Sequence, residues 1–285
     1  MTKFHDLKSA FAALTVLIGV LPGNPAYSAA PTPPPAAPVP SYADLADLVD
    51  EAPVILVAQI RSQSPIEPAR SPGLAPGMVR LYVEARTRAL IFGARAIGDS
   101  LQYLVDVPLD SRAKVPSLKK QVFLIFARPV AGRPGELQLV GRSSQLPWDP
   151  ALEARVRGVI AERNAAGAPV RLEGVREAMF TAGTLAGESE TQIFLATADG
   201  SPAALVIRRR PDLAPVWGVT FSEVLGSEGT VPPRDTLAWY RLACFLPATL
   251  PARANVSESP ADKRAAERDY RLVMDQLGPC PRNLR

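Results

Sequence analysis

Two glutamates spaced two residues apart come nearest to catalytic chemistry in this sequence. Glu188 and Glu190 follow a glycine-containing stretch, and alternation along an extended segment places both side chains on one face. A glycosidase needs two carboxyl groups about 5 to 10 Å apart across a sugar, so a carboxylate-dependent hydrolase is one hypothesis. Acids beside glycines are more often solvent-facing turn residues, so we assign no catalytic residue.

A run of arginines forms a second candidate site. On a predicted strand, Arg208 and Arg210 fall on one face and Arg209 on the other. The first two could hold an anionic ligand, such as a phosphate, a glycan carboxylate or an acidic protein surface. The alternative is a charged strand end that protects a sheet edge. Trp217 could stack on a sugar if it is exposed, and burial in the core is its alternative role.

Most of the usual catalytic groups are missing. The single histidine, His5, lies in a predicted signal peptide, so the mature chain is expected to contain none. The GxSxG, HExxH, GxGxxG and Walker patterns are absent. Lys114 near Ser111 and Ser117 is interpreted as surface charge before a strand and not as a serine/lysine pair. We therefore predict no cofactor and no metal, and favour binding over catalysis.

The two cysteines, Cys244 and Cys280, are predicted to form a disulfide. Residues 234–246 read as a helix, and a second helix begins after Ser259 and ends at Gly278, so a bridge would join the ends of two helices. Closing this loop stabilises the fold by roughly 4 kcal/mol in the chain-entropy model. The alternative of a redox-active pair is disfavoured because the spacing is not C-x-x-C.

The first 40 residues predict export. Residues 1–29 have the order of a signal peptide: Lys3 and Lys8, an apolar run over 10–21, and small residues before the expected cleavage site. Residues 30–40 form a proline-rich linker, expected to be extended and semi-rigid. The predicted location is therefore the periplasm or the exterior, without a transmembrane span after signal cleavage. The alternative is an uncleaved N-terminal anchor.

Composition narrows the range of partners. The formal net charge is only +4, and 47% of residues are hydrophobic, as in a globular chain with a core. A nearly neutral chain is not expected to bind nucleic acid. Frequent alanine, proline and arginine are typical of a GC-rich bacterial genome. We predict a non-catalytic exported protein that contacts another envelope protein or an anionic envelope component. A glycan or small anionic ligand is the alternative, and the oligomeric state stays open.

The predicted fold class is α+β, with a small antiparallel β-barrel over 41–147. A short helix at 41–51 precedes five strands, and turn residues separate them. The expected strands cover residues 53–60, 78–92, 101–109, 121–127 and 136–140. The first is apolar throughout, which is typical of a strand buried on both faces.

The barrel segment resembles the oligonucleotide/oligosaccharide-binding (OB) type, in the version found in netrin-like and metalloproteinase-inhibitor-like modules. The residues behind this resemblance are Ala43–Leu45 with Val54–Val57, and Gln121–Ala127. The resemblance implies a small barrel and, by analogy with those modules, an inhibitory function.

A second α+β domain is predicted over 148–285. It begins with a helix after Asp149 and contains a hairpin of strands 191–197 and 203–209 around the turn Ala198–Ser201. A third strand is expected at 216–224, and the two disulfide-linked helices close the domain. Residues 170–181 fit either a helix or a strand.

Overall fold

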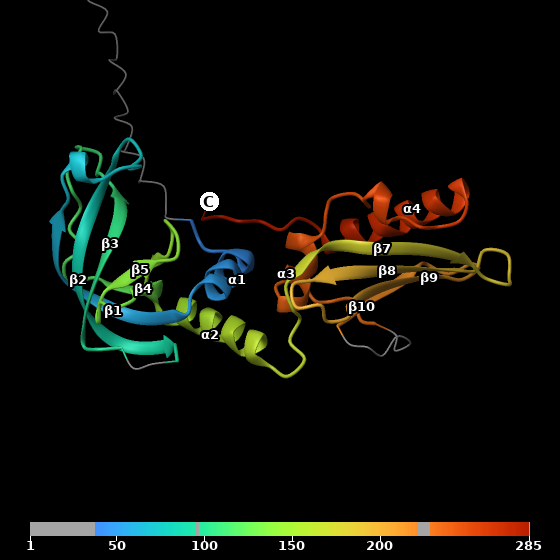
Figure 1. The fold of residues 1–285 in the computed structure, drawn as a ribbon, viewed down its shortest axis with the longest axis horizontal. Helices are drawn as coiled ribbons and strands as arrows, with labels where there is room; N and C mark the ends of the chain where they lie inside the picture. Colours follow the sequence, from blue (N-terminus) through green and yellow to red (C-terminus); the bar gives the residue numbers. More distant parts are fainter. Residues whose placement is uncertain (1–37, 95–96, 222–228, 285) are drawn as a thin grey trace, which may run out of the picture. The chain divides into compact units, whose positions relative to one another are not determined.

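The computed structural model describes residues 38–94, 97–221 and 229–284. The predicted signal peptide and most of the proline-rich linker lie outside the described residues. Pro38–Arg285 form one compact unit. The fold is α+β, with two antiparallel sheets and a few helices (Figure 1). The α-helices are α1 (Tyr42–Glu51), α2 (Pro150–Asn164), α3 (Leu237–Phe245) and α4 (Pro260–Leu277).

The first sheet contains the five strands expected from the sequence and one short addition. Its members are β1 (Val54–Pro65), β2 (Met78–Phe92), β3 (Ser100–Pro108), β4 (Val122–Pro129), β5 (Leu137–Leu139) and β6 (Gln145–Pro147). The strand order is β3-β2-β1-β4-β5, and β6 pairs with β4. Every pairing within this order is antiparallel.

The closed barrel predicted for this region is not found among the described residues. The two end strands of the path, β3 and β5, lie close to each other, but among the described residues the only pairing between them is one isolated parallel bridge, which joins Gln102 to Glu136 just before β5. The physical reason is the length of β5, which has only 3 residues and cannot extend a ladder along the 9 residues of β3. The hydrogen-bond ladder between these two strands is therefore incomplete.

Strand β1 is buried on both faces, as its apolar run predicts. Ile55 and Val57 face one core cluster, whereas Leu56 and Ala58 face a second cluster enclosed by the first sheet. Because side chains alternate along a strand, a polar residue in this segment would face a core whichever way it pointed. This double burial fixes β1 at the centre of its sheet.

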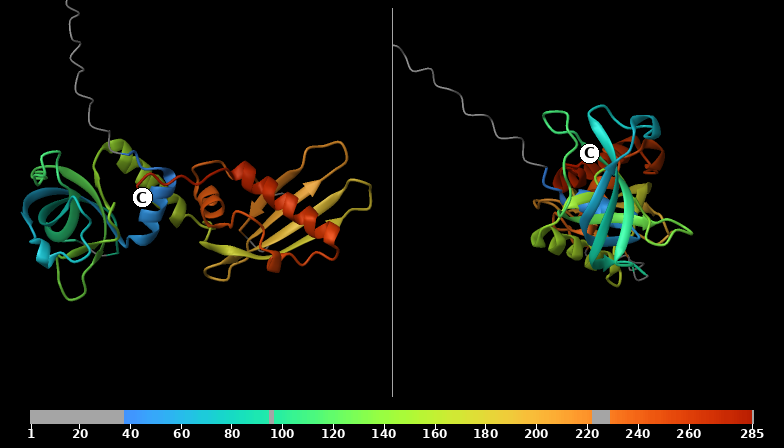
Figure 2. Two further views of the ribbon diagram at one scale, coloured as in Figure 1. Left: turned by 90° about the horizontal axis from the view of Figure 1, so that it is seen from above. Right: turned by 90° about the vertical axis from the view of Figure 1, so that its left-hand side faces the viewer.

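The second sheet has the order β10-β9-β8-β7, and all its pairings are antiparallel. Its strands are β7 (Leu172–Ala182), β8 (Ser189–Thr197), β9 (Ala204–Arg209) and β10 (Val216–Thr220). The ambiguous segment 170–181 is thus a strand. Part of the predicted strand 216–224 falls outside the described residues. Helix α4 lies along one face of this sheet (Figure 2).

The helix ends follow the sequence signals. Ser41 and Asp44 form a capping box at α1, and Ser259 and Asp262 form another at α4. In each box the serine hydroxyl accepts from the backbone of the aspartate, whose carboxylate accepts from the serine backbone. Helix α4 ends at Gly278, whose φ of 68° suits a residue without a Cβ. The predicted ends of this helix are therefore confirmed.

One hydrophobic core crosses the boundary predicted near Trp148. Phe126 from the first sheet, Val156 from α2 and Ile193 from β8 belong to the same buried cluster. Helix α1 joins this cluster through Leu45 and Val49. The division into domains 41–147 and 148–285 remains a prediction, while the packing across it is continuous.

Candidate functional site

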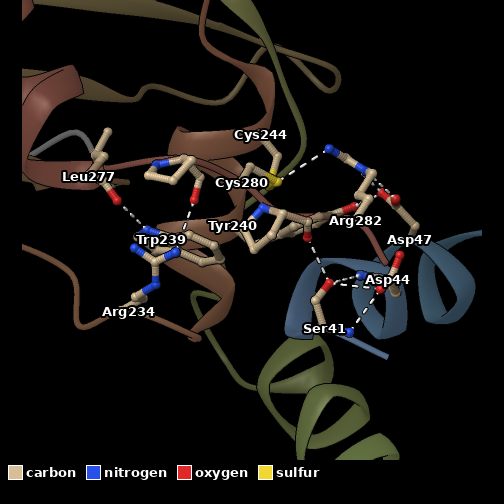
Figure 3. The surroundings of a disulfide bond; sticks show 12 residues. Ser41, Asp44, Asp47, Arg234, Trp239, Tyr240, Cys244, Leu277, Cys280 and Arg282 are labelled. Atoms are coloured by element: carbon tan, nitrogen blue, oxygen red, sulfur yellow. Dashed lines mark hydrogen bonds and ion pairs between the residues drawn. A yellow bond between two sulfur atoms is a disulfide. The ribbon is translucent and has the colours of Figure 1, made fainter. Parts of the chain in front are cut away.

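The disulfide between Cys244 and Cys280 is present, as predicted (Figure 3). It joins the end of α3 to the segment just after α4, with the two Cα atoms 5.3 Å apart. Nearby, the Trp239 indole donates to the carbonyl oxygen of Leu277 over 2.8 Å. The bridge therefore reinforces a contact between α3 and α4 that side chains also make.

The chain that follows helix α4 contains Cys280 and then returns to helix α1. We call its residues 279–284 the C-terminal strap. The Arg282 guanidinium pairs with Asp47 at 2.6 Å (Figure 3). The Ser41 hydroxyl donates to the Pro281 carbonyl at 2.7 Å, and the Asn283 amide donates to Asp44 at 2.9 Å. The strap thus satisfies polar groups at the start of α1.

Glu190 and Arg208, both predicted site residues, are brought together. They face each other across the β8–β9 hairpin and form an ion pair of 2.8 Å. Hydrogen bonds from Arg208 and then from Gln192 lower the pKa of Glu190 below its ordinary value. Glu190 is therefore held as a carboxylate, which does not suit it to act as a general acid.

Glu188 and Arg210 lie at the same end of the sheet. They line a hollow of about 370 Å³ together with the Glu190–Arg208 pair. The Glu188 side chain packs closely on Gly183. If Gly183 carried a Cβ atom, that atom would lie 2.6 Å from the Cγ atom of Glu188. Arg210 is exposed, and no ion pair within the described residues involves it. This hollow is the only region where the structure gathers the predicted acids and arginines among the described residues.

Arg209 points to the opposite face, as alternation predicts. Its guanidinium pairs with Asp269 of α4, which is 1% exposed. The Thr191 hydroxyl donates to the same carboxylate. This buried cluster joins α4 to the sheet and was missed in the sequence, because only the packed structure shows which helix covers the strands.

The Trp217 ring is not exposed at this hollow, as stacking on a sugar would require. It is 5% exposed, and its indole nitrogen donates to Gln276 of α4 over 2.7 Å. Its side chain thus lies on the helix-covered face, whereas Glu190 and Arg208 lie on the other. Burial in the core, the alternative weighed for Trp217, describes its position.

A larger groove lies on the first sheet and contains none of the predicted site residues. Its volume is about 740 Å³, and both β3 and β5 contribute to its walls. The residues around it come from β2, β3, β5 and three loops, and include Gly73, Tyr82, Leu104, Arg133, Gln138 and Arg142. Sequence analysis missed this groove because its residues come together only once the strand order is known.

The charges in the groove are mostly paired. Arg80 forms two hydrogen bonds to Asp106 across the β2–β3 pair, at 2.7 and 2.9 Å. Arg133 pairs with Glu136 at 3.1 Å on the loop before β5. Arg142 is exposed and has no carboxylate partner among residues 38–94, 97–221 and 229–284. The groove therefore offers one uncompensated cation.

The apolar part of the groove is formed by neighbouring strands. Tyr82 of β2 and Leu104 of β3 are register partners, and Leu104 is 49% exposed. Beneath them, Tyr103 is buried and donates to Gln145 over 2.6 Å. Burial raises the pKa of the Tyr103 phenol above its usual range, so it stays protonated. The groove can thus bind an apolar group and a negative charge together.

The described residues contain no group of three or more histidine, cysteine, aspartate or glutamate side chains suited to hold a metal ion. In the same part of the chain, no helix is long and apolar enough to cross a bilayer. A scan against protein-family models finds no match, and a search of curated proteins finds no similar sequence.

Proposed function

We propose that this chain is an exported, non-catalytic protein that acts by binding a partner in the cell envelope. The observation that carries the proposal is the groove of about 740 Å³ on the first sheet. Its acids Asp106 and Glu136 are both paired with arginines, so they are committed to structure rather than free for proton transfer. Export is supported by the signal-like N-terminal sequence and is compatible with a disulfide.

We also propose that the first sheet is an OB-like barrel whose hydrogen-bond ladder is incomplete at one seam. Its strand order supports this, since β1 lies between β2 and β4 while β3 and β5 form the ends. OB barrels are partly open and bind ligands on the face of strands 2 and 3 and on the adjoining loops. The groove has the same position, because it includes Tyr82 and Leu104 from these strands and Gly73 and Arg133 from the loops.

A photo-crosslinking amino acid placed at Tyr82 tests the proposal in the native envelope. A position in the groove should give discrete adducts with a partner. The matched control is Leu213, which is 64% exposed in the loop after β9. Adducts at both positions alike, or at neither, would contradict binding through the groove.

A complementation experiment tests whether the function requires carboxylate catalysis. The double substitution Glu188→Gln and Glu190→Gln keeps side-chain size and removes the charges that carboxylate catalysis requires. We expect the folded double variant to replace the parent in a deletion strain. Loss of function in a folded protein would favour the hydrolase hypothesis instead.

An anionic ligand at the hollow beside Glu190 is a second candidate function, favoured by the exposed Arg210. Arg210→Glu leaves the Glu190–Arg208 pair intact, so it reverses one charge without breaking a structural contact. If an anion is bound there, this substitution should abolish its binding, as measured by titration calorimetry with a phosphate or glycan carboxylate.

A further inference from the structure

We infer that a basic patch on the first sheet binds a linear acidic polysaccharide. The basic patch consists of five exposed cationic side chains: Arg61, Arg86, Arg88, Lys119 and Lys120. None of them lines the groove of about 740 Å³. The basic patch is therefore a second surface, and the inference goes beyond the proposed function.

The strand pairing brings these cations to both sides of β1. On one side, Gln59 of β1 is the register partner of Arg86 of β2. On the other side, the Lys120 amide donates to the carbonyl oxygen of Ile60 over 2.9 Å. The Gln59 side chain connects the two sides, because its nitrogen donates to the Lys120 carbonyl at 2.9 Å and its oxygen accepts from Arg88 at 2.6 Å. The basic patch therefore extends over three adjacent segments, which are β1, β2 and the loop before β4.

The charges of the basic patch are not balanced by carboxylates. None of its members forms an ion pair within the described ranges 38–94, 97–221 and 229–284. Two acids lie on neighbouring segments: Glu84, which accepts from the Ser62 hydroxyl at 2.6 Å, and Asp99, whose carbonyl oxygen accepts from the Thr87 amide. Five cations outnumber these two acids, so the local potential is positive although the net charge of the whole chain is only +4.

The spacing of the cations suits a polymer better than a small anion. Arg86 and Arg88 are alternate residues of β2, so they lie about 6.8 Å apart along the strand, and neighbouring strands lie about 4.8 Å apart. A single phosphate or carboxylate can contact only one or two such side chains. A polymer with a charge on each unit can contact several of them together, and the linked contacts strengthen one another. The ligand is therefore a polyanion.

The other residues of the basic patch indicate which polyanion fits. Segments 59–63, 86–88 and 117–121 contain no aromatic residue, whereas sites for single-stranded nucleic acid combine cations with aromatic rings that stack on bases. Surfaces that bind a bilayer combine cations with projecting apolar side chains. The exposed large apolar residues beside these segments, Leu90 and Val115, are only 38% and 40% exposed. A polysaccharide with a carboxylate on each sugar needs neither feature.

The test measures binding of a fluorescein-labelled oligogalacturonate, which has one carboxylate per sugar, by fluorescence anisotropy on the full chain with its disulfide intact. The matched probe is the methyl ester of the same oligomer, which keeps the rings and removes the charges. We expect the acid to bind and the ester not to bind. The affinity of the acid should fall with salt, with a log–log slope of about −3 for four or five contacts. This comparison uses only the parent protein, so it does not depend on the folding of a variant.

Two charge-matched variants locate the site. The patch variant combines Arg61→Gln, Arg86→Gln and Lys119→Gln, at side chains that are exposed and belong to no ion pair among the described residues. The control variant combines Arg128→Gln, Arg253→Gln and Arg268→Gln, at exposed arginines outside the basic patch that are equally unpaired in the described structure. Both variants lose the same net charge. The patch variant should bind the acid about twentyfold more weakly than the parent, and the control variant should stay within about twofold of it.

Several results would overturn the inference: no binding of the acid, equal binding of the acid and its ester, affinity that does not depend on salt, or equal losses in the two variants. Tighter binding of a single-stranded oligonucleotide of equal charge would assign the basic patch to nucleic acid and overturn it. Tighter binding of phosphatidylglycerol vesicles would assign the basic patch to a membrane and also overturn it. Crosslinking at Tyr82 reports on the groove and not on these cations, so the inference and the proposed function can fail separately.

Discussion

At the scale of single residues, several charged side chains near the candidate sites hold the fold together. Arg209 and Asp269 connect β9 to α4, and Glu190 and Arg208 connect two strands. An ion pair near the core is costly to break on one side only, because the remaining charge loses its partner where water is scarce. These residues are therefore best tested for stability before they are tested for activity.

Asp269 offers the clearest test of this kind. Asp269→Asn should lower the free energy of unfolding by about 2 to 3 kcal/mol, since Arg209 loses its counter-charge. Chemical denaturation measures the change. The control Arg268→Gln lies on the exposed face of the same helix and should change stability little. Equal effects of the two substitutions would contradict a structural role for the buried carboxylate.

Glu190 predicts a pH dependence with a defined sign. Its pKa is lowered in the folded protein, so its contribution to stability is present above the ordinary glutamate pKa and is lost as the pH falls through the lowered value. The difference in unfolding free energy between the parent and Glu190→Gln should shrink on acidification below about pH 4.5. Urea unfolding at several pH values measures it, and a difference that grows in acid would contradict the ion pair.

At the scale of elements, strands with a strong hydrophobic pattern could be predicted from the sequence. Which strands lie next to one another in a sheet could not. The run at β1 and the alternation in β2 identify both strands, and Gly278 marks the end of α4. Segment 170–181 was ambiguous because β7 contains two register shifts, which interrupt the alternation of exposed and buried residues. Strand order depends on contacts between distant segments, which periodicity does not record.

The hairpin that carries Glu190 and Arg208 could be predicted from the sequence, but its register could not. The predicted turn Ala198–Ser201 would place Glu190 opposite Arg209, whereas the observed register places it opposite Arg208. A shift of one residue in register changes which side chains share a face, so the ion pair could not be read from the turn. The groove could not be predicted either, because Tyr82 and Leu104 are ordinary residues of alternating strands.

Strand β3 predicts an alternating pattern of amide exchange in the protein without ligand. The amides of Tyr103 and Val105 bond to β2 and should exchange slowly, whereas those of Leu104 and Asp106 point away from β2, where no strand ladder is found among the described residues, and should exchange fast. Hydrogen exchange followed by NMR measures each amide. Uniform protection along β3 would mean that the outward amides are hydrogen-bonded too.

At the scale of the whole molecule, the disulfide and the continuous core are expected to act together. Cys280→Ser should lower stability by about 4 kcal/mol in the chain-entropy model, before any effect of strain. Because Phe126 and Ile193 share one core, the variant should still unfold in a single transition. Calorimetry tests both points, with Ser143→Ala as a control for the loss of one strap contact. Two separate transitions would instead support independent domains divided near Trp148.

The C-terminal strap has a consequence for how the chain can be connected. Asn283 donates to the carbonyl oxygen of Val39 over 2.8 Å, so the first and last parts of the described fold are in direct contact. A short linker could join them, and a new opening in the exposed loop at Leu213 would leave every strand pairing in place. The contacts of this fold are thus compatible with a circular permutation, in which β10 would come first and β9 last.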